Sequence, residues 1–182
     1  MTDQEALAAL LRERSVSLGD FLLSSGQRST YYIDARKTTM SAEGQRLIGR
    51  LGLAAIRSAG WVPAAVGGLT MGADPVAYAI ARESLDAPPL IQAFSVRKVA
   101  KDHGTRRRIE GNFSAGDPVV IVEDVITSGG SAVQAIDVVT QASGRVLGVL
   151  AVVDREQGGR ESLEARGISV VALTTTSELS LR

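Results

Sequence analysis

Apolar residues in this chain form short continuous runs, separated by stretches with helical spacing. Residues 119–122 and 146–153 are aliphatic runs without polar alternation, which is typical of strands covered on both faces of a parallel sheet. Between them, Val133, Ile136 and Val139 recur at every third position, as on one side of a helix. This order predicts an α/β fold with a doubly wound, mostly parallel sheet.

The rest of the chain continues the alternation of strand and helix. Ser41 is placed to cap a helix that reaches about residue 59, where Gly60 ends it. The elements predicted after it are a strand at 64–66, a glycine-rich turn at 67–74, a helix at about 75–83, strands at 90–96 and 168–173, and a helix at about 160–166. The pattern shows no repeat or linker, so we expect a single domain over residues 1–182.

The first 36 residues have a different pattern. Thr2 and Glu5 have the spacing of a capping box, which predicts a short amphipathic helix that ends before Ser15. Two strand-like runs follow, separated by Gly26. We therefore expect a small antiparallel hood at about residues 1–36, in front of the parallel core.

Charge and composition exclude several classes of protein. The 182 residues include 20 basic and 20 acidic ones, so no net field favours nucleic acid or an anionic membrane. Cysteine is absent, which excludes disulfides and thiolate chemistry and fits a reducing compartment. No apolar run approaches the length of a membrane span, and the N-terminus has acidic residues where a signal peptide has basic ones. We expect a cytoplasmic protein that binds neither nucleic acid nor membrane.

The segment from residue 118 to 131 carries the clearest candidate chemistry. Glu123 and Asp124 are predicted to follow the buried run, at the crevice where parallel sheets bind ligands. Residues 127–131 then provide hydroxyls, backbone N–H groups and two glycines at the start of a helix, which together favour a phosphate. Either half alone could equally be an acidic strand end or an ordinary polar turn. Joined in this order, they favour function.

Three further segments are candidates for anion binding. The turn at residues 67–74 can be a backbone cradle for pyrophosphate or a plain strand-to-helix turn. Residues 97–108 contain many lysines and arginines and the only histidine of the chain. Composition alone predicts a solvated loop. Such a loop can also close over a polyanion. Arg155 follows a predicted strand and can be either a surface ion-pair residue or a bidentate carboxylate ligand.

The sequence EDVITSGGS resembles the phosphoribosyl-diphosphate signature of the type I phosphoribosyltransferases. Other segments resemble the orotate branch of that family: F-x-L-x-S-G, S-x-Y-Y-x-D, R-K-x-x-K-x-H-G and D-R-x-x-G. The matching residues in the first two of these are Phe21, Leu23, Ser25, Gly26, Ser29, Tyr31, Tyr32 and Asp34. We interpret the tyrosines themselves as packing residues. Two lysines of other members are absent here, one at Ser24 and one in the turn at residues 67–75.

This resemblance implies transfer of phosphoribose from 5-phosphoribosyl 1-diphosphate (PRPP) to orotate with Mg²⁺, in a homodimer with shared active sites. It implies catalytic roles for Glu123, Asp124, Lys101 and His103, the last two on a flexible loop at about residues 97–110. The residues implied in PRPP binding are these four and Arg97, Lys98, Thr70, Met71, Gly72, Val125, Ile126, Thr127, Ser128, Gly129, Gly130 and Ser131. The residues implied in orotate binding are Ser25, Gly26, Thr127 and Arg155.

The resemblance implies that Mg²⁺ is bound mainly through substrate and water, with Asp124 as the candidate protein ligand, and that Lys98 acts from the neighbouring subunit.

One alternative is a phosphoribosyltransferase for another base, which would lack the hood and Arg155. The other is a regulator that senses PRPP without catalysis, against which the acidic pair and the basic loop argue.

Overall fold

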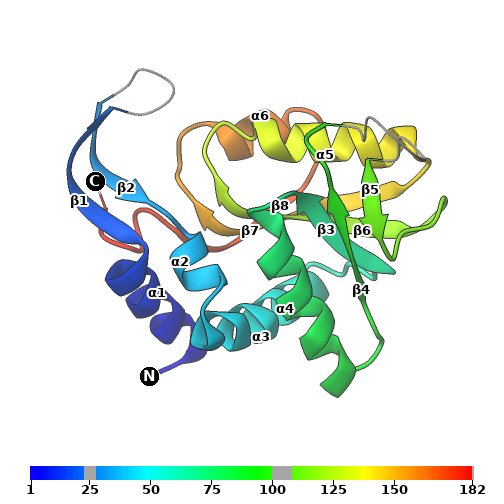
Figure 1. Cartoon of the computed structure of the whole chain (residues 1–182), viewed down its shortest axis with the longest axis horizontal. Helices are drawn as coiled ribbons and strands as arrows, with labels where there is room; N and C mark the ends of the chain where they lie inside the picture. Colours follow the sequence, from blue (N-terminus) through cyan, green and yellow to red (C-terminus); the bar gives the residue numbers. More distant parts are fainter. Residues whose placement is uncertain (23–27, 100–107, 182) are drawn as a thin grey trace.

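A six-stranded sheet forms the centre of the molecule (Figure 1). The structure, a computed structural model, describes residues 1–22, 28–99 and 108–181. In the order in which they lie side by side, the strands are β5 (Ile109–Gly111), β4 (Gln92–Val96), β3 (Ala65–Leu69), β6 (Pro118–Ile126), β7 (Arg145–Asp154) and β8 (Val170–Thr175). All neighbours are parallel except β5, which pairs antiparallel with β4.

Helices cover both faces of this sheet. Figure 1 shows α3 (Ala42–Ser58) and α4 (Ala73–Asp86) on one face, and α5 (Gly130–Gln141) and α6 (Gly159–Glu164) on the other. Successive residues of β6 point to opposite faces, and its buried valines accordingly divide: Val120 and Val122 belong to one hydrophobic core, Val119 to the other. The predicted doubly wound α/β fold is confirmed.

The N-terminal hood consists of two helices and a hairpin. They are α1 (Asp3–Arg14), β1 (Val16–Leu22), β2 (Arg28–Ile33) and α2 (Arg36–Thr39). The capping box is present, since the Thr2 hydroxyl accepts from the Glu5 backbone N–H and the Glu5 carboxylate accepts from that of Thr2. The strands β1 and β2 are antiparallel, as predicted. No helix within the described ranges is both long and apolar enough to cross a bilayer.

The chain leaves β3 and β6 in opposite directions along the sheet. From β3 it passes through α4 to β4, and from β6 through α5 to β7, although β3 and β6 are neighbours. The carboxyl ends of such diverging strands leave a crevice between their loops, where open α/β sheets bind ligands. The turn at residues 70–72 and the segment at 127–131 therefore meet at one edge.

Several element boundaries differ from prediction by a few residues, and two of these differences lie at the crevice. Glu123 and Asp124 do not follow the strand but lie within β6, which continues to Ile126 because Val125 and Ile126 still pair with β7. Gly67 and Gly68 belong to β3 rather than to the turn. A Cβ atom on Gly67 would lie 2.2 Å from the Phe94 carbonyl oxygen, so this glycine permits close packing inside the sheet.

The sequence pattern did not predict α2 or β5. Both are too short, with four and three residues, for a hydrophobic period to repeat within them. The strand β5 also corrects the extent of the basic loop, because Ile109 and Glu110 pair with β4. At the loop's base, the Arg97 N–H donates to the Arg108 carbonyl oxygen at 2.8 Å, and the Arg108 guanidinium donates to the carbonyl oxygens of Arg97 and Lys98.

Candidate active site

A crevice of about 570 Å³ lies at the carboxyl ends of β3 and β6 and is bounded on one side by the hood. The parallel strands bring their loops to this edge, and β2 and α2 contribute the hood residues. Its lining residues are Tyr32, Ile33, Asp34, Ala35, Arg36, Leu69, Thr70, Met71, Gly72, Lys98, Glu123, Asp124, Val125, Thr127, Ser131 and Arg155.

Two carboxylates of β6 face this crevice. Glu123 is 4% exposed, and its Oε1 atom has no hydrogen-bond partner. Burial, and then the charge of Asp124, raises the pKa of Glu123 to about 8, while Lys98 opposes the shift. Burial also raises the pKa of Asp124, although its Oδ1 accepts a hydrogen bond from the Val125 N–H at 2.9 Å. This pair is short of hydrogen-bond donors and cations, both of which a hydroxylated, metal-associated ligand supplies.

A small hollow of about 100 Å³ follows the carboxylates, where β6 turns into α5. It is lined by Glu123 and by residues 125–132. Gly129 has φ = 80°, a conformation that glycine adopts without strain. It places the start of α5 next to the hydroxyl side chains of the turn. Backbone N–H groups and the helix dipole favour an anion there.

Hydrogen bonds hold the turn between β3 and α4. Asp74, in the first turn of α4, accepts from the Thr70 hydroxyl at 2.6 Å and from the Ser95 hydroxyl at 2.7 Å. The Thr70 N–H donates to the Val96 carbonyl oxygen. Gly72 is so close to the acidic pair that a Cβ there would lie 2.5 Å from the Asp124 Oδ1 atom. The turn therefore presents its backbone directly to Asp124.

Arg155 is buried at the other side of the crevice. It is 8% exposed, and its Nε and one terminal nitrogen are buried without a hydrogen-bond partner. Its guanidinium carbon lies 5.1 Å from the centroid of the Tyr31 ring, within range of a cation–π interaction. A buried, unpaired guanidinium is costly unless a ligand satisfies it, and its planar donors match a carboxylate.

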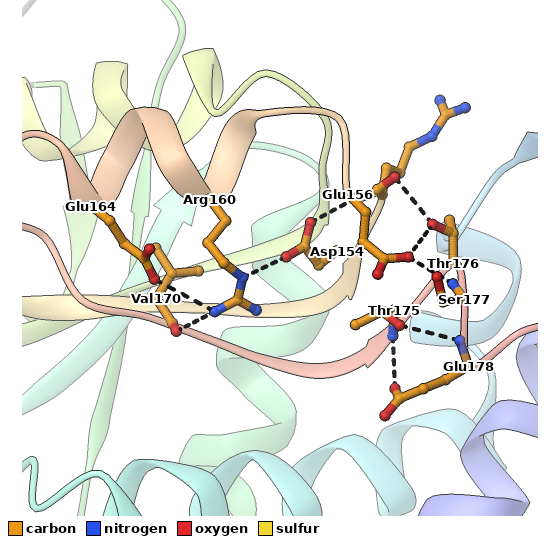
Figure 2. Close-up of polar contacts among 10 residues, drawn as sticks. Asp154, Glu156, Arg160, Glu164, Val170, Thr175, Thr176, Ser177 and Glu178 are labelled. Atoms are coloured by element: carbon orange, nitrogen blue, oxygen red, sulfur yellow. Dashed lines mark hydrogen bonds and ion pairs between the residues drawn. The ribbon is translucent and has the colours of Figure 1, made fainter.

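The backbone around Arg155 is fixed by the polar network in Figure 2. Arg160 of α6 donates to Asp154 at 2.8 Å and to the Val170 carbonyl oxygen. The Glu156 carboxylate accepts from the Thr176 hydroxyl and from the Ser177 N–H. The Arg155 N–H donates to the Ile126 carbonyl oxygen at 2.9 Å. These contacts position the guanidinium relative to β6.

The described end of the basic loop adds cations at the crevice. Lys98 lines the crevice of its own chain, whereas the resemblance implied that it acts from the neighbouring subunit. Arg97 lines an adjoining hollow together with Thr70 and Lys98. The Arg97 guanidinium lies 3.7 Å from the Glu110 carboxylate. The crevice thus combines a carboxylate pair, a turn that presents its backbone, a buried arginine with unpaired nitrogens and an adjoining hollow at the start of α5.

The chain matches known proteins over nearly its full length. Orotate phosphoribosyltransferase of Aquifex aeolicus is 45% identical over 182 residues, which cover 98% of both chains. The chain belongs to the orotate phosphoribosyltransferase family. The enzyme of Mycobacterium avium is 47% identical and covers 97% of this chain and 96% of its own. No protein-family model matches.

Solved structures extend the match to three dimensions. A crystal structure of Mycobacterium tuberculosis H37Rv orotate phosphoribosyltransferase in complex with PRPP superposes with a TM-score of 0.83 at 40% identity, over 99% of this chain and all of that one. Family membership decides between the alternatives left open by the sequence, because it identifies the chain as a pentosyltransferase of the orotate branch.

Most of the predicted family site is brought together. The crevice contains Thr70, Met71, Gly72, Lys98, Glu123, Asp124, Val125, Thr127, Ser131 and Arg155, and the adjoining cradle adds Ile126, Ser128, Gly129 and Gly130. Arg97 lies beside them, as described above. The predicted Ser25, Gly26, Lys101 and His103 lie outside the described residues.

The sequence pattern did not identify the hood side of the crevice. Tyr32, Ile33, Asp34, Ala35 and Arg36 line it, although none of them was predicted to bind substrate. The S-x-Y-Y-x-D pattern is the available signal, and the interpretation of its tyrosines as packing residues leaves out the crevice. That interpretation is incomplete: Tyr31 is buried but contacts Arg155, and Tyr32 is 43% exposed at the crevice.

Proposed function

We propose that this crevice transfers the phosphoribosyl group of PRPP to orotate, giving orotidine 5′-monophosphate and diphosphate in the synthesis of UMP. The bond from ribose C1 to the diphosphate oxygen breaks, and its electron pair leaves with diphosphate. A bond from C1 to a ring nitrogen of orotate forms, and that nitrogen releases its proton. The observation that carries this assignment is the buried, unpaired guanidinium of Arg155 in the same crevice as Glu123 and Asp124. Orotate has the planar carboxylate that this guanidinium lacks.

PRPP fits the other half of the crevice. Its 5-phosphate matches the cradle at residues 127–131, where backbone N–H groups and hydroxyls converge. Its diphosphate matches the turn at residues 70–72, which faces Asp124. The ribose hydroxyls then lie over the two carboxylates of β6. The M. tuberculosis relative has been solved in complex with PRPP, which supports PRPP as the ligand.

The carboxylates have a chemical role in this arrangement. Departure of diphosphate before attack leaves an oxocarbenium-like ribose, which nearby negative charge stabilises. Asp124 supplies such charge. Glu123, with a pKa of about 8, is mostly protonated near neutral pH before ligands bind, so it can donate a hydrogen bond to a ribose hydroxyl. A cation beside it lowers that pKa and makes it an acceptor.

Mg²⁺ fits this site as a partner shared with the substrate. Within residues 1–22, 28–99 and 108–181, no group of three or more His, Cys, Asp or Glu side chains could hold a metal alone. Mg²⁺ commonly takes one or two carboxylates and completes its shell with phosphate oxygens and water. Asp124 and the unpaired Oε1 of Glu123 are suitable carboxylate oxygens. When bound, the ion would neutralise the charge of the departing diphosphate.

The basic loop and a second subunit complete the proposal. We assign Arg97, Lys98, Lys101 and His103 to the departing diphosphate, with the last two reaching the active site of the partner in a homodimer. Exposed apolar side chains favour such a partner: Tyr78 and Leu85 on α4, and Val99 within the loop, are 53%, 61% and 73% exposed. We further place the enzyme in the cytoplasm, without nucleic-acid or membrane partners, because the chain is cysteine-free and its charges balance.

Turnover of purified protein with PRPP and Mg²⁺ tests this function. We expect release of diphosphate with orotate, and little release with uracil, adenine or hypoxanthine, because these bases lack a carboxylate for Arg155. Turnover of a base other than orotate would support a different phosphoribosyltransferase. PRPP binding without turnover of any base would support the regulator.

A further inference from the structure

The charges of the crevice leave its diphosphate end with few cations. Among the described residues that line it, the acidic ones are Asp34, Glu123 and Asp124, and the basic ones are Arg36, Lys98 and Arg155. Arg155 is assigned to the base. A diphosphate with several negative charges, placed next to Asp124, therefore depends on Lys98 and on the cation of the hood.

Arg36 lies on the hood side of the turn that is proposed to bind diphosphate. It is in α2, and it lines the crevice together with Met71 and Gly72. It also lines a further hollow on the hood side, again with Met71. It does not line the hollow at residues 125–132, which is proposed to hold the 5-phosphate. Its position therefore distinguishes the two anionic ends of PRPP.

Asp34 orients this guanidinium without using all of its donors. The Arg36 Nε donates to the Asp34 Oδ1 atom at 2.8 Å. Within the described residues, the Arg36 side chain makes this one hydrogen bond, through its Nε. Its terminal amino groups are therefore available to a ligand. The hydrogen bond to Asp34 raises the pKa of Arg36, and the charge of Asp124 adds to the shift. The guanidinium is thus within electrostatic reach of Asp124.

We propose that Arg36 binds the diphosphate of PRPP from the hood side, opposite Lys98, and that Asp34 positions it. This role rests on the proposed function and adds a residue to it. Because the turn at residues 70–72 offers mainly backbone donors, the hood supplies the side-chain charge. Orotidine 5′-monophosphate has no diphosphate, so Arg36 discriminates between the substrate and the product nucleotide.

Calorimetric measurement of the Kd for PRPP and for orotidine 5′-monophosphate, on the Arg36→Gln chain with Mg²⁺ present, tests this role. We expect the Kd for PRPP to rise by about tenfold or more, the usual effect of losing a charged hydrogen bond, and the Kd for orotidine 5′-monophosphate to stay within about twofold. Arg36→Lys should recover part of the PRPP affinity. The matched control is Arg50→Gln. The Arg50 side chain is 50% exposed and pairs with Asp3 at 3.1 Å, much as the Arg36 side chain is 48% exposed and pairs with Asp34.

The outcomes separate this role from others. Unchanged PRPP binding by the Arg36→Gln chain would overturn it, and so would an equal loss of affinity for both ligands, which indicates a structural defect. An equal loss of PRPP affinity in the Arg50→Gln chain would also overturn it, because general surface charge would then explain the effect. If the wild-type chain itself does not bind PRPP, the proposed function fails, and this inference fails with it.

Discussion

The Arg155 guanidinium carbon lies 5.1 Å from the centroid of the Tyr31 ring, so the hood hairpin holds a residue that comes from the end of β7. Both side chains are buried, with 8% of each exposed. This contact joins two segments that are more than a hundred residues apart in the chain. It also explains how an arginine without a polar partner on two of its nitrogens can stay in place before substrate binds.

Replacing Tyr31 by Leu should weaken orotate binding, because it removes the ring that orients Arg155. We expect the KM for orotate to rise by roughly 2- to 30-fold, in line with a cation–π interaction of about 0.5–2 kcal/mol. Tyr31→Phe keeps the ring and should behave like wild type. Steady-state kinetics on chains with matched thermal unfolding checks this. A Phe variant as impaired as the Leu variant would indicate that the hydroxyl matters and not the ring.

Replacing Arg155 by Ala should affect orotate far more than PRPP. A charged hydrogen bond in a partly dry site contributes ~1.5–3 kcal/mol, so we expect the KM for orotate to rise about 10- to 100-fold while that for PRPP changes little. Arg166→Ala, an exposed position after α6, serves as control. Equal effects on both substrates would contradict the assignment of Arg155 to the base.

The pattern of residues predicted the β6 half of the site but not the hood half. The run of β-branched residues before Glu123 and the glycines after Thr127 identify a strand, a turn and a helix by local chemistry alone. Arg36 offered no such signal. Its place at the crevice follows from how α2 packs against α3 and α4. The helix α2 has only four residues, so no repeating hydrophobic pattern within it predicts this packing.

Burial has the same non-local origin. The missing partners of Arg155 and the raised pKa of Glu123 depend on what surrounds each side chain in space, and sequence spacing does not contain that information. Gly67 and Gly68 are a further case. Adjacent glycines favour a turn by propensity, yet here they lie in a central strand, because the Phe94 and Val122 carbonyl oxygens leave no room for a Cβ.

The raised pKa of Glu123 predicts that stability depends on pH. Between 4.5 and about 8 the folded chain keeps a proton on Glu123 that the unfolded chain has lost. The free energy of unfolding should therefore fall as pH rises through this window, by at most about 1.4 kcal/mol per pH unit from this group. Glu123→Gln should remove this contribution, so that its stability relative to wild type increases with pH.

Denaturant unfolding of the ligand-free chains, from roughly pH 5 to roughly pH 9, checks this prediction. The same burial raises the pKa of Asp124, so wild type has more than one source of pH dependence. The difference between wild type and Glu123→Gln isolates one of them. Glu13→Gln, at an exposed position of α1, is the control. A difference that stays constant with pH would mean that Glu123 ionises normally in the folded chain.

Removing the charge of Asp124 while keeping its shape should slow the chemical step. In Asp124→Asn, less negative charge faces the developing ribose cation, and we expect kcat to fall by at least about tenfold with the fold intact. Asp137→Asn, on the exposed side of α5, should have no such effect. The measurement is kcat at saturating substrate with circular dichroism of each chain. Near-normal turnover of a folded Asp124→Asn chain would rule out this role.

Subunit mixing tests whether the basic loop serves its own crevice or that of a partner. The loop is anchored at Arg97 and Arg108, and Val99 within it and Tyr78 on α4 are exposed apolar residues. Closure across a two-fold interface is therefore the arrangement that we propose. Lys101→Ala and Asp124→Asn place one defect in the loop and the other in β6, and each variant alone should be nearly inactive.

If the loop acts across the interface, the two variants should complement when subunits exchange. Random mixing makes about half of the dimers hybrid, and each hybrid then has one site with both defects and one with neither, so roughly a quarter of wild-type sites should return. If the loop serves its own subunit, every site keeps one defect. Differently tagged subunits allow the hybrid to be purified before its activity is measured. Hybrid activity that stays at the mean of the two variants would refute the shared site, and it would leave the chemistry assigned to Asp124 unchanged.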